Sequence, residues 1–248
     1  MACNGEILSN VRINYLLGLM RSKKYVIYKR PFELNIIGMR NKDTNPISFD
    51  DFLYVIYKDD NNKWTGLKFA ITTDPSTKYL ERGGIGSYQG QSASAILPSG
   101  QYIDTWKIGS HKGKYTALTQ AKPLCVYRDY DRNALLSFNI EDLDCGLFGI
   151  NIHKAKSGGA DNGQGDTLEI GDYSAGCQVF QNFYCFEAFM DLVKKQQSIY
   201  GNKYFTYTLF DKWTKNKLYI KRTIFLTGVI AGISLVGYGL YLNSKKNK

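Results

Sequence analysis

Histidine is almost missing from this chain. Only two of the 248 residues are histidines, and the five cysteines form no Cys-x-x-Cys pair. A structural zinc site needs four Cys or His ligands at short, regular spacings, and the two histidines stand far apart. The odd number of cysteines and their irregular spacing also argue against a disulfide scaffold. We therefore expect no metal and no cofactor, and a reducing compartment or at least one working free thiol. The cysteines are Cys3, Cys125, Cys145, Cys177 and Cys185.

Two further signals are missing. The start of the chain, Met1 to Glu6, has neither the charged region nor the apolar core of a secretory signal peptide, so none is expected. The formal net charge of +10 does not indicate a nucleic-acid-binding domain, because the charge lies at one end. Residues 212–248 hold eight of the 32 Lys and Arg residues and no acid, which leaves 24 basic against 22 acidic residues elsewhere. A folded body with so small an excess predicts no binding to DNA or RNA.

One long apolar run is present near the C-terminus. Residues 223–242 carry no charge, and a helix of this length spans about 30 Å, the thickness of a bilayer's hydrocarbon core. Basic residues flank the run, Lys221 and Arg222 before it and three lysines after it. This pattern predicts a single-pass C-terminal membrane anchor, and the Gly228/Gly232 pair permits a homodimer. The positive-inside bias weakly favours a cytoplasmic domain and leaves the side of the membrane open.

The chemistry is concentrated in two short segments. A strand-like run from Phe148 ends in His153, and the segment Tyr173–Val179 places Cys177 directly after a glycine. An imidazole beside a thiol is the usual means of activating a cysteine nucleophile. The alternative is a buried cysteine and a core histidine with no chemical role. From the residues alone both interpretations stay open.

These segments resemble the catalytic core of the L,D-transpeptidases, the YkuD-type peptidoglycan enzymes, in which a histidine and a loop precede a Ser/Thr-His-Gly-Cys signature. The resemblance covers about Leu34 to Phe210, including the stretch Ile96–Tyr102, and is closest to a divergent branch associated with bacteriophages and Bacteroidetes. Three features depart from the family. Ala175 replaces the second histidine of the motif, Gln178-Val179 replaces an apolar residue followed by Arg or Asn, and the His-to-Cys loop is longer.

The resemblance implies a cysteine acyltransferase or peptidase that acts on peptidoglycan stem peptides. Cys177 would be the nucleophile and His153 the general base, and the resulting thioester would be resolved by an amine or by water. The backbone N–H groups of Gly176 and Cys177 would form the oxyanion hole. A supporting or substrate-binding role is expected for Ser174, Tyr173, His111 and Gln178.

Two of these supporting residues have alternatives. Ser174 either fixes the loop or contributes its hydroxyl to the site. His111 lies in a turn-like segment between glycines, where it is either an exposed turn residue or a substrate contact that compensates for Ala175.

The pattern of the chain predicts a mainly β fold with peripheral helices. The resemblance makes this fold an L,D-transpeptidase-like β-sandwich or open barrel. Helices are expected over Asn10–Arg21 and Phe183–Tyr200, an irregular loop over Gly83–Ser99, and strands elsewhere, including Leu135–Phe138 and Gly149–His153. The expected parts are an N-terminal helical extension (1–30), a catalytic domain (31–210), a basic linker (211–222), the membrane helix (223–242) and a basic tail (243–248).

Two other function classes compete with this one. Ala175 and the missing arginine after the cysteine favour a non-enzymatic, tail-anchored membrane or virion protein that keeps the fold. A papain-like protease ranks third, because it places its cysteine before its histidine and here the order is reversed.

Overall fold

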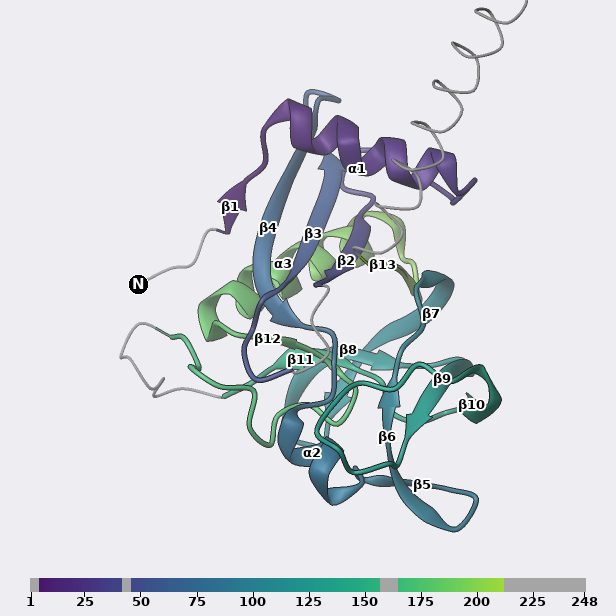
Figure 1. Ribbon diagram of the computed structural model, residues 1–248. Coiled ribbons are helices and arrows are strands. Elements are labelled where there is room, and N and C mark those ends of the chain that lie inside the picture. The colour runs from purple at the N-terminus through teal and green to yellow at the C-terminus, as the bar shows by residue number, and fades with distance from the viewer. Residues whose placement is uncertain (1–4, 42–45, 157–164, 212–248) are drawn as a thin grey trace, which may run out of the picture. The chain divides into compact units, whose positions relative to one another are not determined.

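Eight strands close into a barrel in the computed structural model, which describes residues 5–41, 46–156 and 165–211 (Figure 1). They are β2 (Asn35–Arg40), β3 (Asp51–Lys58), β4 (Trp64–Thr72), β7 (Gly100–His111), β8 (Tyr115–Gln120), β11 (Ile152–Lys154), β12 (Gln178–Phe180) and β13 (Phe205–Asp211). The order around the ring is β4–β12–β11–β8–β7–β13–β2–β3. The mainly β prediction is confirmed. The barrel is closed rather than open because β4 pairs along one edge with β12 and along the other with β3.

A second sheet of four strands stands beside the barrel, in the order β10–β9–β6–β5 (Figure 1). Its members are β5 (Gly86–Tyr88), β6 (Gln91–Ile96), β9 (Leu124–Asp129) and β10 (Leu143–Gly146). The predicted irregular loop over residues 83–99 is therefore wrong, since β5 and β6 form a hairpin there. Small polar residues have low β propensity, and pairing of β6 with β9 overrides it. The strand predicted over residues 135–138 is also wrong, because these residues form no strand.

The remaining elements cover the sheets. The two-residue strand β1 (Glu6–Ile7) pairs with β4, and η1 (Ile140–Asp142) and α2 (Thr77–Arg82) are short helical turns. Helix α1 (Asn10–Ser22) starts at Ser9, whose hydroxyl accepts a hydrogen bond from the N–H of Arg12. Helix α3 (Phe183–Tyr200) starts at an Asn182 cap and stops at Gly201 in the left-handed conformation. Both long helices match the predicted segments.

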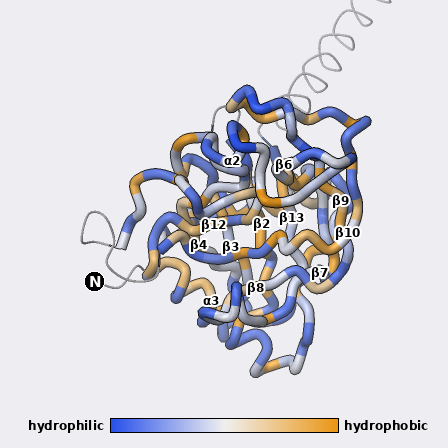
Figure 2. Tube along the Cα trace, turned by 90° about the horizontal axis from the view of Figure 1, so that it is seen from below, coloured by the Kyte–Doolittle hydropathy of each residue, from blue (hydrophilic) through white to orange (hydrophobic). Residues whose placement is uncertain are grey.

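The core lies between the barrel strands and the apolar faces of the helices. Trp106 is fully buried, its ring meets Tyr207 edge to face, and its indole N–H donates to the carbonyl of Ile150 at 2.7 Å. On α3 the buried side chains follow helical spacing at Phe186, Phe189, Met190 and Val193. Figure 2 shows the hydrophobic stretches of the strands gathered in the interior and the hydrophilic stretches mostly on the outer loops. This distribution is what burial of apolar surface requires of a small barrel.

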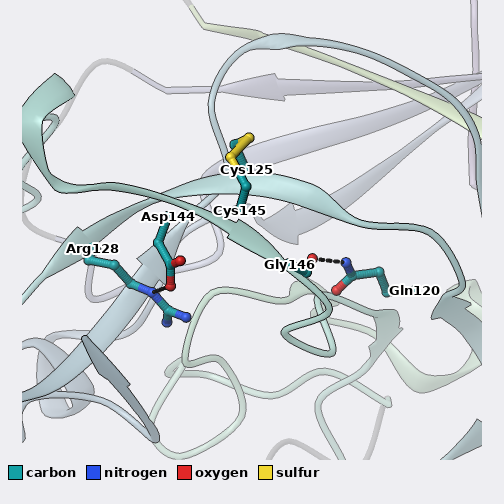
Figure 3. Close-up of a disulfide and its surroundings, with 6 residues drawn as sticks. All are labelled: Gln120, Cys125, Arg128, Asp144, Cys145 and Gly146. Atoms are coloured by element: carbon teal, nitrogen blue, oxygen red, sulfur yellow. Dashed lines mark hydrogen bonds and ion pairs between the residues drawn. A yellow bond between two sulfur atoms is a disulfide. The ribbon is translucent and has the colours of Figure 1, made fainter. Parts of the chain in front are cut away.

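A disulfide joins Cys125 on β9 to Cys145 on β10, which stand directly opposite each other in the antiparallel pair (Figure 3). Cys185 is disulfide-bonded as well, and Cys177 is the free cysteine of the described part of the chain. The expectation that the cysteines form no disulfides is therefore wrong, whereas Cys177 is the free thiol that was expected. The expectation failed because spacing along the chain does not show which cysteines become neighbours across two strands.

Replacing Cys125 and Cys145 together by alanine is expected to lower the free energy of unfolding by about 3 kcal/mol, the typical effect of a cross-link that closes a loop of this size. The measurement is chemical denaturation of both proteins without reductant. Replacing the exposed Lys107 by alanine on the barrel serves as a control and should change little. A double variant as stable as the parent would contradict the cross-link.

The chain divides after Phe210 into two units. In the first, the buried side chains of α1 pack on β2 and β3, so this helix belongs to the same body as the barrel. No helix of the described residues is long and apolar enough to cross a membrane. The predicted anchor at 223–242, its Gly228/Gly232 pair and the basic tail lie outside the described residues.

Candidate active site: a cysteine and two histidines around one cavity

The neighbourhood of His153 and Cys177 results from one strand pairing. Strands β11 and β12 run parallel, with His153 opposite Val179 and Ile152 opposite Gln178. Cys177 directly precedes β12, and the N–H of Gln178 donates to the carbonyl of Asn151 at 2.9 Å. The long segment between the two strands makes the crossover that parallel pairing requires. The parallel pair therefore brings the predicted base and nucleophile to the same edge of the barrel.

Both residues line a cavity of about 470 Å³. Of the predicted site residues, Cys177, His153, His111 and Tyr173 contribute to its wall, and Ala175 lies there as well. Ser174 and Gln178 are fully buried and do not line it. Sequence reasoning did not identify three polar residues of the wall, which are Lys112, Arg128 and Asn151.

The Cys177 sulfur lies against the backbone of the segment before β11. Its thiol donates to the carbonyl of Gly149 at 3.4 Å, and the sulfur accepts a hydrogen bond from the N–H of Asn151 at 3.4 Å. Burial raises the pKa of this thiol, and the Asn151 N–H and the charge of Lys112 offset the rise only in part. Cys177 is therefore a neutral thiol at pH 7 and becomes a nucleophile only when a base removes its proton.

His153 is held in one tautomer. Its Nδ1 lies 2.8 Å from the carbonyl oxygen of Lys154, and because a carbonyl can only accept, Nδ1 carries the proton. The Tyr115 hydroxyl donates to the same carbonyl at 3.0 Å. The lone pair is thus on Nε2. Burial, followed by the neighbouring His111, lowers the pKa of His153 to about 3. The ring is therefore neutral at pH 7, with a free lone pair but a weaker basicity than an ordinary imidazole.

The His111 ring stacks on the His153 ring with their centroids 4.0 Å apart. Its Nδ1 lies 3.1 Å from the side-chain amide of Asn151, and burial together with Lys112 and Lys114 lowers its pKa to about 4. His111 is buried at the end of β7 and lines the cavity, so an exposed turn residue is the wrong interpretation. His111 is therefore one of two stacked histidine rings in the cavity wall.

Asn151 links two of the three groups, Cys177 and His111, to strand β8. Its N–H contacts the Cys177 sulfur, its amide nitrogen contacts His111, and its Oδ1 accepts from the N–H of Gln120 at 2.9 Å. No hydrogen bond within the described residues joins His153 to Cys177 directly. Catalytic hydrogen bonds are often longer before substrate binds, so this geometry is compatible with a base that engages on binding.

Ser174 and Gly176 shape the loop that presents the cysteine. The Ser174 hydroxyl lies 2.6 Å from the carbonyl of Asp74 and 2.9 Å from the carbonyl of Cys177, and it accepts the N–H of Gly176 at 3.2 Å. These contacts place Ser174 inside the loop rather than in the cavity. They also occupy the Gly176 N–H, which corrects its expected role in an oxyanion hole. Among the described residues the N–H of Cys177 has no partner and stays available for that role.

Gln178 lies behind the cysteine. Its Oε1 accepts from the Tyr207 hydroxyl at 2.8 Å within the core. It therefore supports the loop from inside and does not touch a ligand in the cavity.

A buried ionic cluster lies under the loop. Arg40 is 2.7 Å from a carboxylate oxygen of Asp74, and it donates to Thr73, which in turn donates to Asp51. Burial and the neighbouring Asp74 raise the pKa of Asp51 to about 7. The backbone carbonyl of Asp74 also accepts a hydrogen bond from the Ser174 hydroxyl, so the cluster fixes the base of the cysteine loop. No sequence motif indicated it, since its members come from three separate segments.

Gly176 is required where it stands. Its φ is +130°, and a Cβ built there would lie 2.1 Å from the carbonyl oxygen of Ala95 on β6. Gly176→Ala is therefore expected to destabilise the domain by about 1–3 kcal/mol through backbone strain and to displace Cys177. Thermal unfolding and the alkylation rate of Cys177 measure the two effects. Gly90→Ala is the matched control, because Gly90 also has a positive φ but has open space around it. Equal losses in both variants would contradict the close approach to β6.

The comparisons with known proteins give no family. No family model matches the chain, and neither a curated protein nor a solved structure matches it. The described residues also contain no group of three His, Cys, Asp or Glu side chains placed to hold a metal ion. The function of this protein is therefore inferred from the geometry of the cavity.

Proposed function

We propose that this protein is a membrane-anchored cysteine acyltransferase or peptidase of the L,D-transpeptidase type that acts on peptidoglycan stem peptides. One observation carries the proposal. A free thiol, Cys177, lines the same cavity as His153, whose Nδ1 proton is fixed on a backbone carbonyl and whose ring is neutral. That combination supplies a nucleophile and a base without a preformed thiolate.

The chemistry proceeds in two steps. His153 Nε2 takes the proton of the Cys177 thiol while the sulfur attacks a peptide carbonyl, and the N–H of Cys177 stabilises the oxyanion. The C–N bond then breaks, and His153 returns the proton to the leaving amine. An acceptor amine or a water molecule attacks the thioester and frees the thiol. The amine gives transpeptidation and water gives hydrolysis.

Incubation with tetrapeptide-bearing muropeptides followed by mass analysis tests this proposal. The expected products are a covalent adduct on Cys177 that lacks the terminal amino acid, and either a cross-linked or a shortened peptide. Replacing Cys177 by alanine controls for contaminating enzymes. Absence of both adduct and product, with a folded protein, would refute the peptidoglycan substrate.

A non-enzymatic membrane or virion protein remains the second candidate. The raised pKa of Cys177, the missing hydrogen bond to His153 among the described residues, and Ala175 favour it. A thiol that reacts with neutral electrophiles no faster than a buried cysteine, and forms no acyl adduct with any peptide, would support this candidate.

The anchor belongs to the same proposal. We propose that residues 223–242 span the bilayer and that the folded domain lies on its oxidising side. The Cys125–Cys145 disulfide supports that side, because such bonds persist where thiols are not kept reduced. Peptidoglycan lies outside the membrane, so the disulfide and the substrate favour the same orientation. Lys221 and Arg222 favour the opposite one only weakly.

Deleting residues 219–248 is expected to move the protein from the membrane fraction to the soluble fraction, because about twenty apolar residues are needed to cross a bilayer. Deleting only residues 243–248 is the control and should leave the protein in the membrane. In intact cells, a membrane-impermeant maleimide should label Cys177 of the full chain. Labelling only after lysis would place the domain on the other side, and a truncated protein that still pellets would indicate a second lipid-binding segment.

A further inference from the structure

Arg128 is a buried cation whose donors are only partly used. Its side chain on β9 is 5% exposed, and its Nε donates to a carboxylate oxygen of Asp144 on β10 at 2.9 Å. The guanidinium lies over the ring of Phe148, 4.3 Å from the centroid. Figure 3 shows the Nε turned toward Asp144 and the two terminal nitrogens on the other side of the group. No group of the described residues accepts a hydrogen bond from those two nitrogens. These donors open on the cavity, where water or a ligand supplies the acceptors that a largely buried guanidinium needs.

The terminal nitrogens stand at the wall of the cavity that holds the cysteine. Arg128, Gly86 and Phe148 line it together with Cys177 and His153. Gly86 leaves Nη1 uncovered, since a Cβ at this position would approach it to 2.8 Å. The disulfide cross-links β9 to β10 beside this pair, so Arg128 and Asp144 are held on strands that cannot separate. The cation is therefore fixed in place before a ligand arrives.

The charges of the wall favour an anion with one negative charge. The carboxylate of Asp144 compensates the charge of Arg128. Lys112 adds a second cation to the wall, where its charge lowers the pKa of both His111 and His153. The one acid of the wall, Asp172, forms ion pairs with Lys78 and Arg82, which do not line the cavity. The wall residues alone, Arg128 and Lys112 against Asp172, carry a single positive charge, which matches a carboxylate. A guanidinium binds a carboxylate with two parallel N–H···O bonds.

We propose that the terminal nitrogens of Arg128 bind a carboxylate of the ligand and place it at a fixed position relative to the Cys177 sulfur. The site then selects molecules that carry a free carboxylate close to the group that Cys177 attacks. Only the nature of that molecule rests on the proposed function. The carboxylate subsite itself is a property of the cavity.

A pair of thiol reagents that differ in charge tests the subsite. Iodoacetate and iodoacetamide alkylate the same thiolate. The ionised fraction of Cys177, which its pKa sets, therefore cancels from the ratio of the two rates. The rates are measured on the full-length protein in detergent by mass analysis of the Cys177 peptide, with glutathione as the reference thiol. We expect the iodoacetate-to-iodoacetamide ratio of Cys177 to exceed that of glutathione by about tenfold or more, the effect of one charge-assisted hydrogen bond. We also expect the iodoacetate rate to saturate with concentration.

Arg128→Gln should return the ratio to that of glutathione, and Arg128→Lys should retain part of the preference. Lys107→Gln, which removes a charge exposed on the barrel away from the cavity wall, should not change it. A parent ratio equal to that of glutathione would overturn the proposal even if the Arg128 variants fail to fold. So would an unchanged ratio in a folded Arg128→Gln protein. Because no peptide is used, the subsite can be verified or refuted whether or not muropeptides are turned over.

Discussion

Replacing Cys177 by alanine is expected to abolish acyl-enzyme formation, and replacing it by serine should be nearly as damaging. Alanine has no nucleophile. A serine hydroxyl is far less acidic than a thiol, and a neutral imidazole that lacks a carboxylate partner is a poor base for it. The fold should survive both changes, because the side chain is only partly buried and contacts two backbone groups. Mass analysis after incubation with a donor peptide gives the fraction acylated, and the unfolding temperature verifies the fold.

The other cysteines provide the control. The double replacement of Cys125 and Cys145 should lower stability but still allow acylation of Cys177 at a temperature where the variant is folded, since neither sulfur lines the cavity. If that variant lost its acyl adduct while a Cys177→Ala protein kept one, the assignment of the nucleophile would be wrong. A partial loss in the double variant would indicate that the cross-link also positions Arg128.

Local patterns were sufficient to predict the two long helices. Helix α1 has a capping serine followed by apolar residues at helical spacing, and α3 has the same spacing and ends at Gly201, so both can be recognised without knowledge of the rest of the chain. Strand β6 could not be recognised in this way. Its serines and alanines have no strong preference, and it becomes a strand because β9 and β5 offer it partners. Closure of the barrel likewise depends on β4 pairing with β12, which lies more than one hundred residues further along the chain.

The candidate site likewise contains residues that the sequence indicates and residues that it does not. The chemical types of Cys177 and His153 and the flanking glycine make them candidates from the sequence alone. Asn151 and Arg128 carry no such signal, because an asparagine before a strand or an arginine on one has many ordinary uses. Their importance follows from contacts with residues far away in the sequence, Asn151 with Cys177 and His111, and Arg128 with the cavity. The disulfide escaped prediction for the same reason.

Replacing His153 by alanine is expected to lower the rate of acylation by roughly two to four orders of magnitude, the usual contribution of a general base. The pH dependence makes this prediction specific. The pKa of His153 is lowered to about 3, so its ring is unprotonated at any pH above about 4, and the parent rate should stay level between pH 5 and 8 rather than fall below pH 6.5. An ordinary histidine base would lose its activity in that interval.

The variant should behave differently, because without a base only the ionised thiol can attack. Burial raises the pKa of Cys177, so the residual rate should climb about tenfold for each pH unit through the neutral range, and the gap to the parent should narrow in alkali. Tyr115→Phe is the matched control. It removes a hydroxyl that shares the Lys154 carbonyl with His153 but leaves the imidazole, and it should reduce the rate far less. A His153→Ala protein with a level pH profile, or a parent whose rate falls below pH 6.5, would show that His153 does not take the proton from Cys177.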